Sequence, residues 1–179
     1  MIVSYIAGGI FMPEEQNNIK EYGTVNSDGI EIVTIIGEIE GHQNLGRDSK
    51  TTSYEHMLPL LASYERNADV KGILYLINTI GGDVSCGLSI AEMIAGLSKP
   101  SVSLIIGDSH SIGLPIAVAA DYSYIVPSAT VVIHPVRMNG TILGTGQTYR
   151  QFKSIQDRII SFVAAHSQCP EYELERMMM

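Results

Sequence analysis

Apolar residues recur in two patterns along this chain, and the patterns alternate. Residues 30–36 alternate between apolar and polar side chains, whereas residues 72–77 and 101–106 are continuous apolar runs; all three predict strands. Helical spacing of apolar residues predicts four helices, and two short β-branched runs predict further strands. The helices are expected over residues 54–66, 86–97, 114–120 and 147–166, and the short strands over 122–126 and 130–133. Strands that alternate with helices predict parallel crossovers in an α/β fold.

Polar, turn-rich stretches separate these elements. Residues 13–29 contain the turn signal Asn-Ser-Asp-Gly, residues 41–53 predict a loop, and residues 138–146 predict a glycine-rich flexible segment. Residues 1–12 are apolar, lack a basic region and are too short to span a bilayer, so we interpret them as an edge strand or contact segment, with a membrane anchor as the alternative. We therefore expect an extension over residues 1–29 and a single domain over residues 30–179.

Composition narrows the class of protein. The 179 residues are 45% hydrophobic and 17% charged with a net charge of −8, which is typical of one globular domain. Lys and Arg do not cluster, and this argues against nucleic acid as a partner. Cys86 and Cys169 match no metal or redox spacing, so we expect two reduced thiols in a cytoplasmic protein.

Candidate chemistry lies in residues 107–113, where the spacing is Gly-x-Ser-x-Ser-x-Gly between a predicted strand and a predicted helix. Such a turn exposes a nucleophilic hydroxyl and leaves backbone N–H groups free to bind an oxyanion. The local spacing does not choose between Ser109 and Ser111. Ser111 is equally suited to cap the following helix, because serine is a favoured N-cap residue. His134, at the end of a predicted strand, is a candidate base or an ordinary strand-end histidine.

Five short motifs follow one another in an order that resembles a known family. They are Ile-Glu-Gly-His at 39–42, Lys-Thr-Thr-x-Tyr-Glu-His at 50–56, Gly-Gly-Asp-Val at 81–84, His-Ser-Ile-Gly at 110–113 and Ile-His-Pro-Val-Arg at 133–137. Together they resemble ClpP, the proteolytic subunit of the Clp protease and a serine peptidase, and most closely its subgroup of translocation-enhancing proteins, TepA. The resemblance extends over residues 30–176. It implies a ClpP/crotonase-like fold of repeated β-β-α units with a protruding handle helix over residues 147–166 and the C-terminal part missing.

The resemblance also assigns roles to residues. Ser111 matches the nucleophile, which removes Ser109 from consideration, and His134 matches the general base. The backbone N–H groups of Gly82 and Ile112 match the oxyanion hole, and glycine at position 82 would let the backbone approach the substrate. Asp83 is expected to cap the following helix, and His110 to shape the turn. Neither a cofactor nor a metal ion is implied.

The acid of the family's triad does not appear at its matching position. Counting from His134 places that aspartate beyond Met179, and neither Asp121 nor Asp157 matches it. The sequence is therefore a truncated product, a serine–histidine dyad with another orienting group, or an inactive paralogue. The expected function is an ATP-independent or partner-assisted serine endopeptidase that forms an acyl-enzyme on Ser111. The alternatives are a non-catalytic assembly subunit and, on weaker grounds, a crotonase-type acyl-CoA enzyme.

The expected partners follow from the same resemblance. The substrate would be an extended peptide or an unfolded protein, bound beside the Gly-Gly turn and opposite residues 138–144. Homo-oligomeric rings would stack through the handle helices, and an AAA+ unfoldase is a candidate partner. No membrane span is expected.

Overall fold

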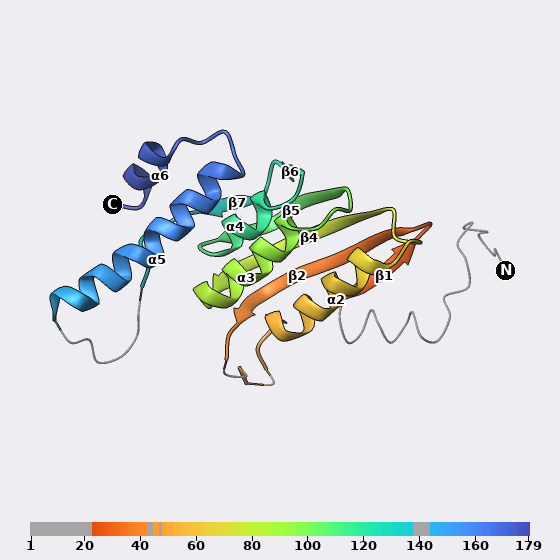
Figure 1. Cartoon of the computed structure of the whole chain (residues 1–179), viewed down its shortest axis with the longest axis horizontal. Coiled ribbons are helices and arrows are strands. Elements are labelled where there is room, and N and C mark those ends of the chain that lie inside the picture. Colours follow the sequence, from red (N-terminus) through yellow and green to blue (C-terminus); the bar gives the residue numbers. More distant parts are fainter. Residues whose placement is uncertain (1–22, 43–44, 47, 138–143) are drawn as a thin grey trace.

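The computed structural model describes residues 23–42, 45–46, 48–137 and 144–179, and it places a seven-stranded sheet behind a layer of helices (Figure 1). Chain order alternates between strands and helices, as the apolar pattern predicted. The elements are β1 (Thr24–Ser27), β2 (Ile30–Glu40), β3 (Thr51–Ser53), α2 (Tyr54–Arg66), β4 (Gly72–Gly82), α3 (Val84–Ala95), β5 (Ser101–His110), α4 (Gly113–Val118), β6 (Tyr122–Ile125), β7 (Thr130–Val132), α5 (Gly146–Ala165) and α6 (Glu171–Met177).

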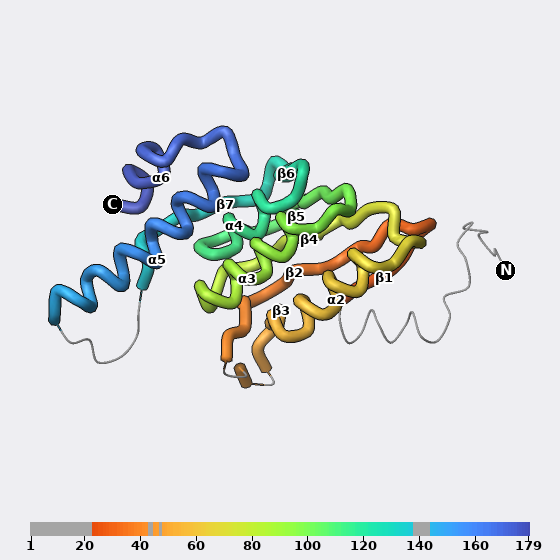
Figure 2. Tube along the Cα trace, viewed as in Figure 1, coloured from red at the N-terminus to blue at the C-terminus, as the bar shows by residue number. Residues whose placement is uncertain are grey.

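Parallel pairing dominates the sheet. The strand order is β1-β2-β4-β5-β6, with β3 beside the end of β2 and β7 beside the end of β5. Every pair is parallel except β1 with β2, which a tight turn makes antiparallel. Helices α2, α3 and α4 connect successive parallel strands and lie on one side of the sheet, as the tube in Figure 2 shows. The predicted parallel crossovers are therefore confirmed.

The core lies between this helical layer and one face of the sheet. Val33, Ile35, Tyr75 and Ile77 are fully buried there, because alternate residues of a strand point to the same face. Burial of each such side chain stabilises the fold by about 1.5–3 kcal/mol. The opposite face is covered less: Ile36 keeps 40% of its surface exposed. The sequence predicted that residues 72–77 are buried on both faces; Leu74 and Leu76 on this face of β4 are only half-buried.

The strands are longer than their apolar runs. β4 continues through Gly82 and β5 through His110, so the predicted strand ends at Ile77 and Ile106 are wrong, and His110 is a strand residue. The register shifts between Ile77 and Thr79 where β4 pairs with β5. Polar and glycine residues adopt strand conformation here because both neighbouring strands supply hydrogen-bond partners.

Three elements were not predicted. β1 and β3 are short polar segments that form strands because they pair with β2, and α6 lies in the tail of the chain. The turn signal at 26–29 is confirmed, since Asp28 and Gly29 both have positive φ between β1 and β2. The predictions for residues 1–12 and for 138–143 lie outside the described residues. The division into an extension and a domain stays a prediction.

Helix α5 extends away from the sheet, as expected for a handle. Its buried residues all lie near its C-terminal end, from Ile159 to Val163, and Figure 1 shows the other end reaching beyond the rest of the molecule. Helix α6 then folds back so that Leu174 and Met178 are buried. Residues 177–179 are three methionines, the methionine tail, and of these Met178 is packed into the fold.

Candidate active site

Ser111 occupies the junction between β5 and α4 in a strained backbone conformation. Its φ is +55°, in the left-handed region, where a residue with a β-carbon is disfavoured by about 1–2 kcal/mol. Two hydrogen bonds hold the junction: Ser111 N–H donates to Val132 O at 2.7 Å, and Leu114 N–H donates to Ser111 O at 3.1 Å. Strain that the surrounding structure enforces is typical of functional sites.

The two serines of this segment differ in access. Ser109 is fully buried and its hydroxyl has no hydrogen-bond partner among the described residues, whereas Ser111 is half-buried. Ser109 lies in β5 with its side chain toward the helical layer, so a substrate cannot reach it. The capping interpretation of Ser111 is wrong, because Ile112 is the N-cap residue of α4 and no side chain caps this helix.

The Gly81–Gly82 turn at the end of β4 lies directly against Ser111. A β-carbon added to Gly81 would lie 2.7 Å from His110 O and 2.8 Å from Ser111 Cβ, and one added to Gly82 would lie 2.2 Å from Ile39 O. These separations are too short for a side chain, so only glycine permits the approach. Thr79 fixes the turn: its hydroxyl donates to Gly37 O at 2.6 Å and accepts from Gly81 N–H at 3.1 Å.

Two backbone N–H groups border this contact. Asp83 N–H donates to Ile39 O in β2, and consecutive peptide groups of a strand point to opposite edges. Gly82 N–H comes directly before this bond, in the Gly81–Gly82 turn that lies against Ser111. The Ile112 N–H starts helix α4 and takes part in no hydrogen bond of the described residues.

His134 follows β7, which pairs with the end of β5 through His110 and Val132. This pairing brings the histidine to a cavity of about 120 Å³ that Ser111 and Gly82 also line. The Nδ1 atom of His134 lies 2.7 Å from the carbonyl oxygen of Pro135. In the described residues, no hydrogen bond joins the imidazole to the Ser111 hydroxyl. Catalytic hydrogen bonds are often long before substrate binds.

Aliphatic side chains and one arginine complete the walls of this cavity. The remaining residues that line it are Val84, Ile133, Val136, Arg137, Ile159 and Met178. They come from α3, from the chain after β7 and from α5, with Met178 just after α6. No pattern in the sequence indicated that the methionine tail would reach the candidate site.

The carboxylates near this region have other partners. Asp83 accepts from Cys86 N–H at 2.9 Å, which confirms it as the N-cap of α3. Asp108 accepts from the Thr130 hydroxyl at 2.7 Å, whereas Asp121 lies at the opposite end of β5, where it accepts from Ser101 N–H at 2.7 Å. Among the described residues, none of the hydrogen bonds or ion pairs joins a carboxylate to His134. No group of three or more metal-ligating side chains occurs in this part of the chain either.

Burial removes Cys86 as an alternative nucleophile. Desolvation, followed by the hydrogen bond with Asp83, raises the pKa of the Cys86 thiol to about 12. A thiolate is the nucleophilic form of cysteine, so this thiol is inert near neutral pH.

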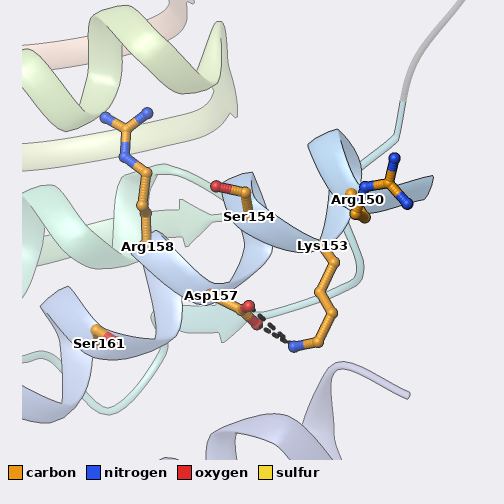
Figure 3. A pocket seen from close by; sticks show the side chains of 6 residues that line it. All are labelled: Arg150, Lys153, Ser154, Asp157, Arg158 and Ser161. Carbon is orange, nitrogen blue, oxygen red and sulfur yellow. Dashed lines mark hydrogen bonds and ion pairs between the residues drawn. The ribbon is translucent and has the colours of Figure 1, made fainter. Parts of the chain in front are cut away.

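A larger hollow of about 350 Å³ lies on α5, away from Ser111. Figure 3 shows Lys153 and Asp157 turned toward each other across it, with Nζ 2.7 Å from Oδ1. All six residues that line it belong to α5 and are polar or charged, and none lines the Ser111 cavity. Asp157 is engaged in this ion pair, and no described hydrogen bond or ion pair joins it to His134.

Comparison with known proteins agrees with this geometry. The sequence model of the Clp protease family matches residues 28–179. The chain is 46% identical over 163 residues to the translocation-enhancing protein TepA of Halalkalibacterium halodurans, covering 91% of this chain and 62% of that protein. It is 33% identical over 119 residues to an ATP-dependent Clp protease proteolytic subunit of Leuconostoc citreum, covering 65% of this chain and 54% of that one.

A solved structure has the same fold. A point mutant of ClpP1 from Listeria monocytogenes superimposes with a TM-score of 0.64 at 20% identity, covering 81% of this chain and 77% of that chain. The predicted α/β fold of the ClpP type is therefore confirmed. The chain spans 62% and 54% of the lengths of the two relatives.

Proposed function

Because the chain belongs to the Clp protease family, we propose that it is a serine peptidase that cleaves peptide bonds through an acyl-enzyme on Ser111. One observation carries the proposal: the Gly81–Gly82 turn contacts Ser111 in its left-handed conformation. Substrate backbone can approach the serine hydroxyl closely only beside a turn without side chains.

The reaction uses groups of this chain. His134 Nε2 accepts the Ser111 hydroxyl proton as Oγ attacks the substrate carbonyl carbon. The N–H groups of Gly82 and Ile112 donate to the oxygen that becomes negative. The imidazolium then gives its proton to the leaving amine as the C–N bond breaks. Water, deprotonated by the same nitrogen, hydrolyses the ester and restores Ser111.

The cavity beside Ser111 has room for about one side chain of the substrate. Its volume is about 120 Å³, and its walls combine aliphatic residues with the side chains of His134 and Arg137. The substrate is an extended peptide or an unfolded protein. The segment proposed to lie opposite it falls mainly in residues 138–143, outside the described residues.

Partners and location follow from the family. Homo-oligomeric rings that stack through α5, an AAA+ unfoldase as a partner and a cytoplasmic location all belong to this proposal. None of the helices in the described residues combines the length and apolar content needed to cross a bilayer.

A non-catalytic assembly subunit is the second candidate. The observation that favours it is the lack, among the described residues, of a carboxylate bonded to His134. Loss of the acid from a Ser-His-Asp triad lowers the rate by about 10⁴. Catalytic competence therefore has to be measured directly.

A fluorophosphonate probe tests the proposal on the intact, folded protein. We expect the probe to modify Ser111, and Ser111→Ala to abolish the modification. Ser109→Ala is the matched control, because it removes the buried, unpartnered hydroxyl two residues earlier and should be labelled like the wild type. Absence of label on wild-type Ser111, or equal loss in both variants, would reject a serine peptidase and leave the assembly subunit.

A further inference from the structure

We infer that three side chains, Asp108, His110 and Thr130, form a latch that holds strand β7 against the end of β5. By fixing β7, the latch positions Ser111 and His134. The inference rests on the proposed function, because it concerns the reactivity of Ser111. The three residues are positioning residues, and none of them is among those that line the cavity beside Ser111.

The latch is a chain of side-chain hydrogen bonds between the two strands. The Thr130 hydroxyl donates to Asp108 Oδ1 at 2.7 Å, and His110 Nε2 lies 2.9 Å from the same hydroxyl oxygen. A hydroxyl has one proton, and the carboxylate accepts it, so the hydroxyl oxygen must accept from His110 Nε2–H. His110 Nε2 also lies 3.4 Å from Asp108 Oδ1. One hydroxyl on β7 therefore joins two side chains of β5.

The strand that these bonds hold is short and exposed. β7 has three residues, none of them buried, and it pairs with the last three residues of β5. So short a strand makes few backbone hydrogen bonds, and cross-strand side-chain pairs add to its stability. In the register, Thr130 lies opposite Asp108, and Val132 lies opposite His110. The latch thus spans the whole length of β7.

Both proposed catalytic residues depend on this strand. Ser111 N–H donates to the carbonyl oxygen of Val132, the last residue of β7, at 2.7 Å. The left-handed conformation of Ser111 persists only while its surroundings enforce it, and this hydrogen bond is part of that enforcement. His134 follows Val132 by two residues. Fraying of β7 would therefore release Ser111 and displace His134 from the cavity that both line.

Thr130→Val tests the latch, because valine keeps the β-branched shape of threonine and removes the hydroxyl. Thr130 is exposed, so the substitution disturbs no core packing. We expect protection of the Ser111 amide against hydrogen exchange, measured by NMR on the intact protein, to fall about tenfold, the effect of one hydrogen bond to a charged group. Fluorophosphonate labelling of Ser111 should slow by about threefold or more, because small displacements of reacting groups lower the rate.

Two variants serve as controls. Thr130→Ser restores the hydroxyl, so amide protection and labelling should return close to the wild-type values. Ser123→Ala removes another hydroxyl hydrogen bond of the same sheet. The Ser123 hydroxyl donates to Ala117 O at 2.7 Å, and it lies in β6, which pairs with an earlier part of β5. Its loss should leave protection and labelling of Ser111 unchanged.

A double-mutant cycle shows whether His110 acts through the same hydroxyl, and it uses a second variant should Thr130→Val not fold. His110→Ala should also lower amide protection of Ser111, and its effect should be much smaller when Thr130 is already valine.

The latch would be overturned by unchanged protection or labelling in Thr130→Val, by equal effects in Ser123→Ala, by a serine variant that restores neither, or by additive effects in the cycle. Amide exchange requires no reactive serine. If the wild-type protein were not labelled, the proposed function would fail, while the exchange measurements would still decide whether the latch holds Ser111.

Discussion

Ser111→Gly should make the protein more stable while it removes the nucleophile. The left-handed φ of +55° costs a residue with a β-carbon about 1–2 kcal/mol, and glycine relieves this cost. Glycine also gives the unfolded chain more freedom, which costs about 0.4–1 kcal/mol. The net gain is therefore about 0.5–1 kcal/mol. No described hydrogen bond uses the Ser111 hydroxyl, so its loss subtracts little.

Ser111→Ala supplies the comparison that isolates the strain. Alanine also lacks the hydroxyl but keeps the β-carbon, so it should unfold close to the wild type. Glycine at this position should raise Tm by about 1–4 °C over alanine. Urea denaturation at neutral pH would give the same difference as a free energy, and neither variant should react with a fluorophosphonate.

Asp28→Gly is the control that relieves a positive φ at a position outside the candidate site. Asp28 has φ of +53° but lies in the β1–β2 turn, at the opposite end of the sheet from Ser111. The gain in stability from Asp28→Gly should be smaller than that from Ser111→Gly, because aspartate tolerates this conformation better than most residues. Ser111 in the Asp28→Gly variant should be labelled at the wild-type rate. If Ser111→Gly were no more stable than Ser111→Ala, the argument that the site stores backbone strain would fail.

Two further predictions concern the Gly81–Gly82 turn and the stability of the protein at high pH. Gly82→Ala places a β-carbon 2.2 Å from a β2 carbonyl oxygen, so the turn must move and labelling of Ser111 by the probe should slow by about 10² or more. Gly46→Ala is the control, because nothing lies within 4 Å of its β-carbon, and it should leave the labelling rate unchanged. Equal labelling rates in the two variants would refute the proposed role of Gly82. Burial raises the pKa of Cys86 to about 12 and raises the pKa values of Tyr64 and Tyr75. Folding thus favours their neutral forms, so urea midpoints should be constant below about pH 8.5 and fall toward pH 12. Cys86→Ala should reduce that slope, and an unchanged slope would contradict the role of the thiol.

The sequence predicted elements where local pattern determines structure. Helix α2 has the predicted bounds, and β4 and β5 begin at the predicted residues, because periodicity reports which face is buried. Their far ends could not be predicted, since Gly81, Gly82 and Ser109 form strand only through pairing with neighbouring strands. β1 and β3 were missed for the same reason.

In the candidate site too, some features could be predicted from the sequence and others depend on how the strands pair. Residue types in the Ser111 turn suggested a nucleophile, and the family resemblance chose the serine and its base. The contact of Gly81 with Ser111 depends on the register of two strands, which no local pattern gives. The Pro135 carbonyl could not be found at all, because every residue has a carbonyl and only the fold decides where each one points.

Backbone groups therefore form much of this site. The Val132 carbonyl accepts from Ser111 N–H, the Ile39 carbonyl accepts from Asp83 N–H beside Gly82, and the Pro135 carbonyl lies 2.7 Å from His134 Nδ1. Because a single Nδ1–H is well satisfied by one acceptor, a carboxylate that reached His134 from any other segment would have to displace the Pro135 carbonyl. Because a carbonyl carries no charge, only a carboxylate in that place would stabilise the imidazolium that forms when Nε2 takes a proton.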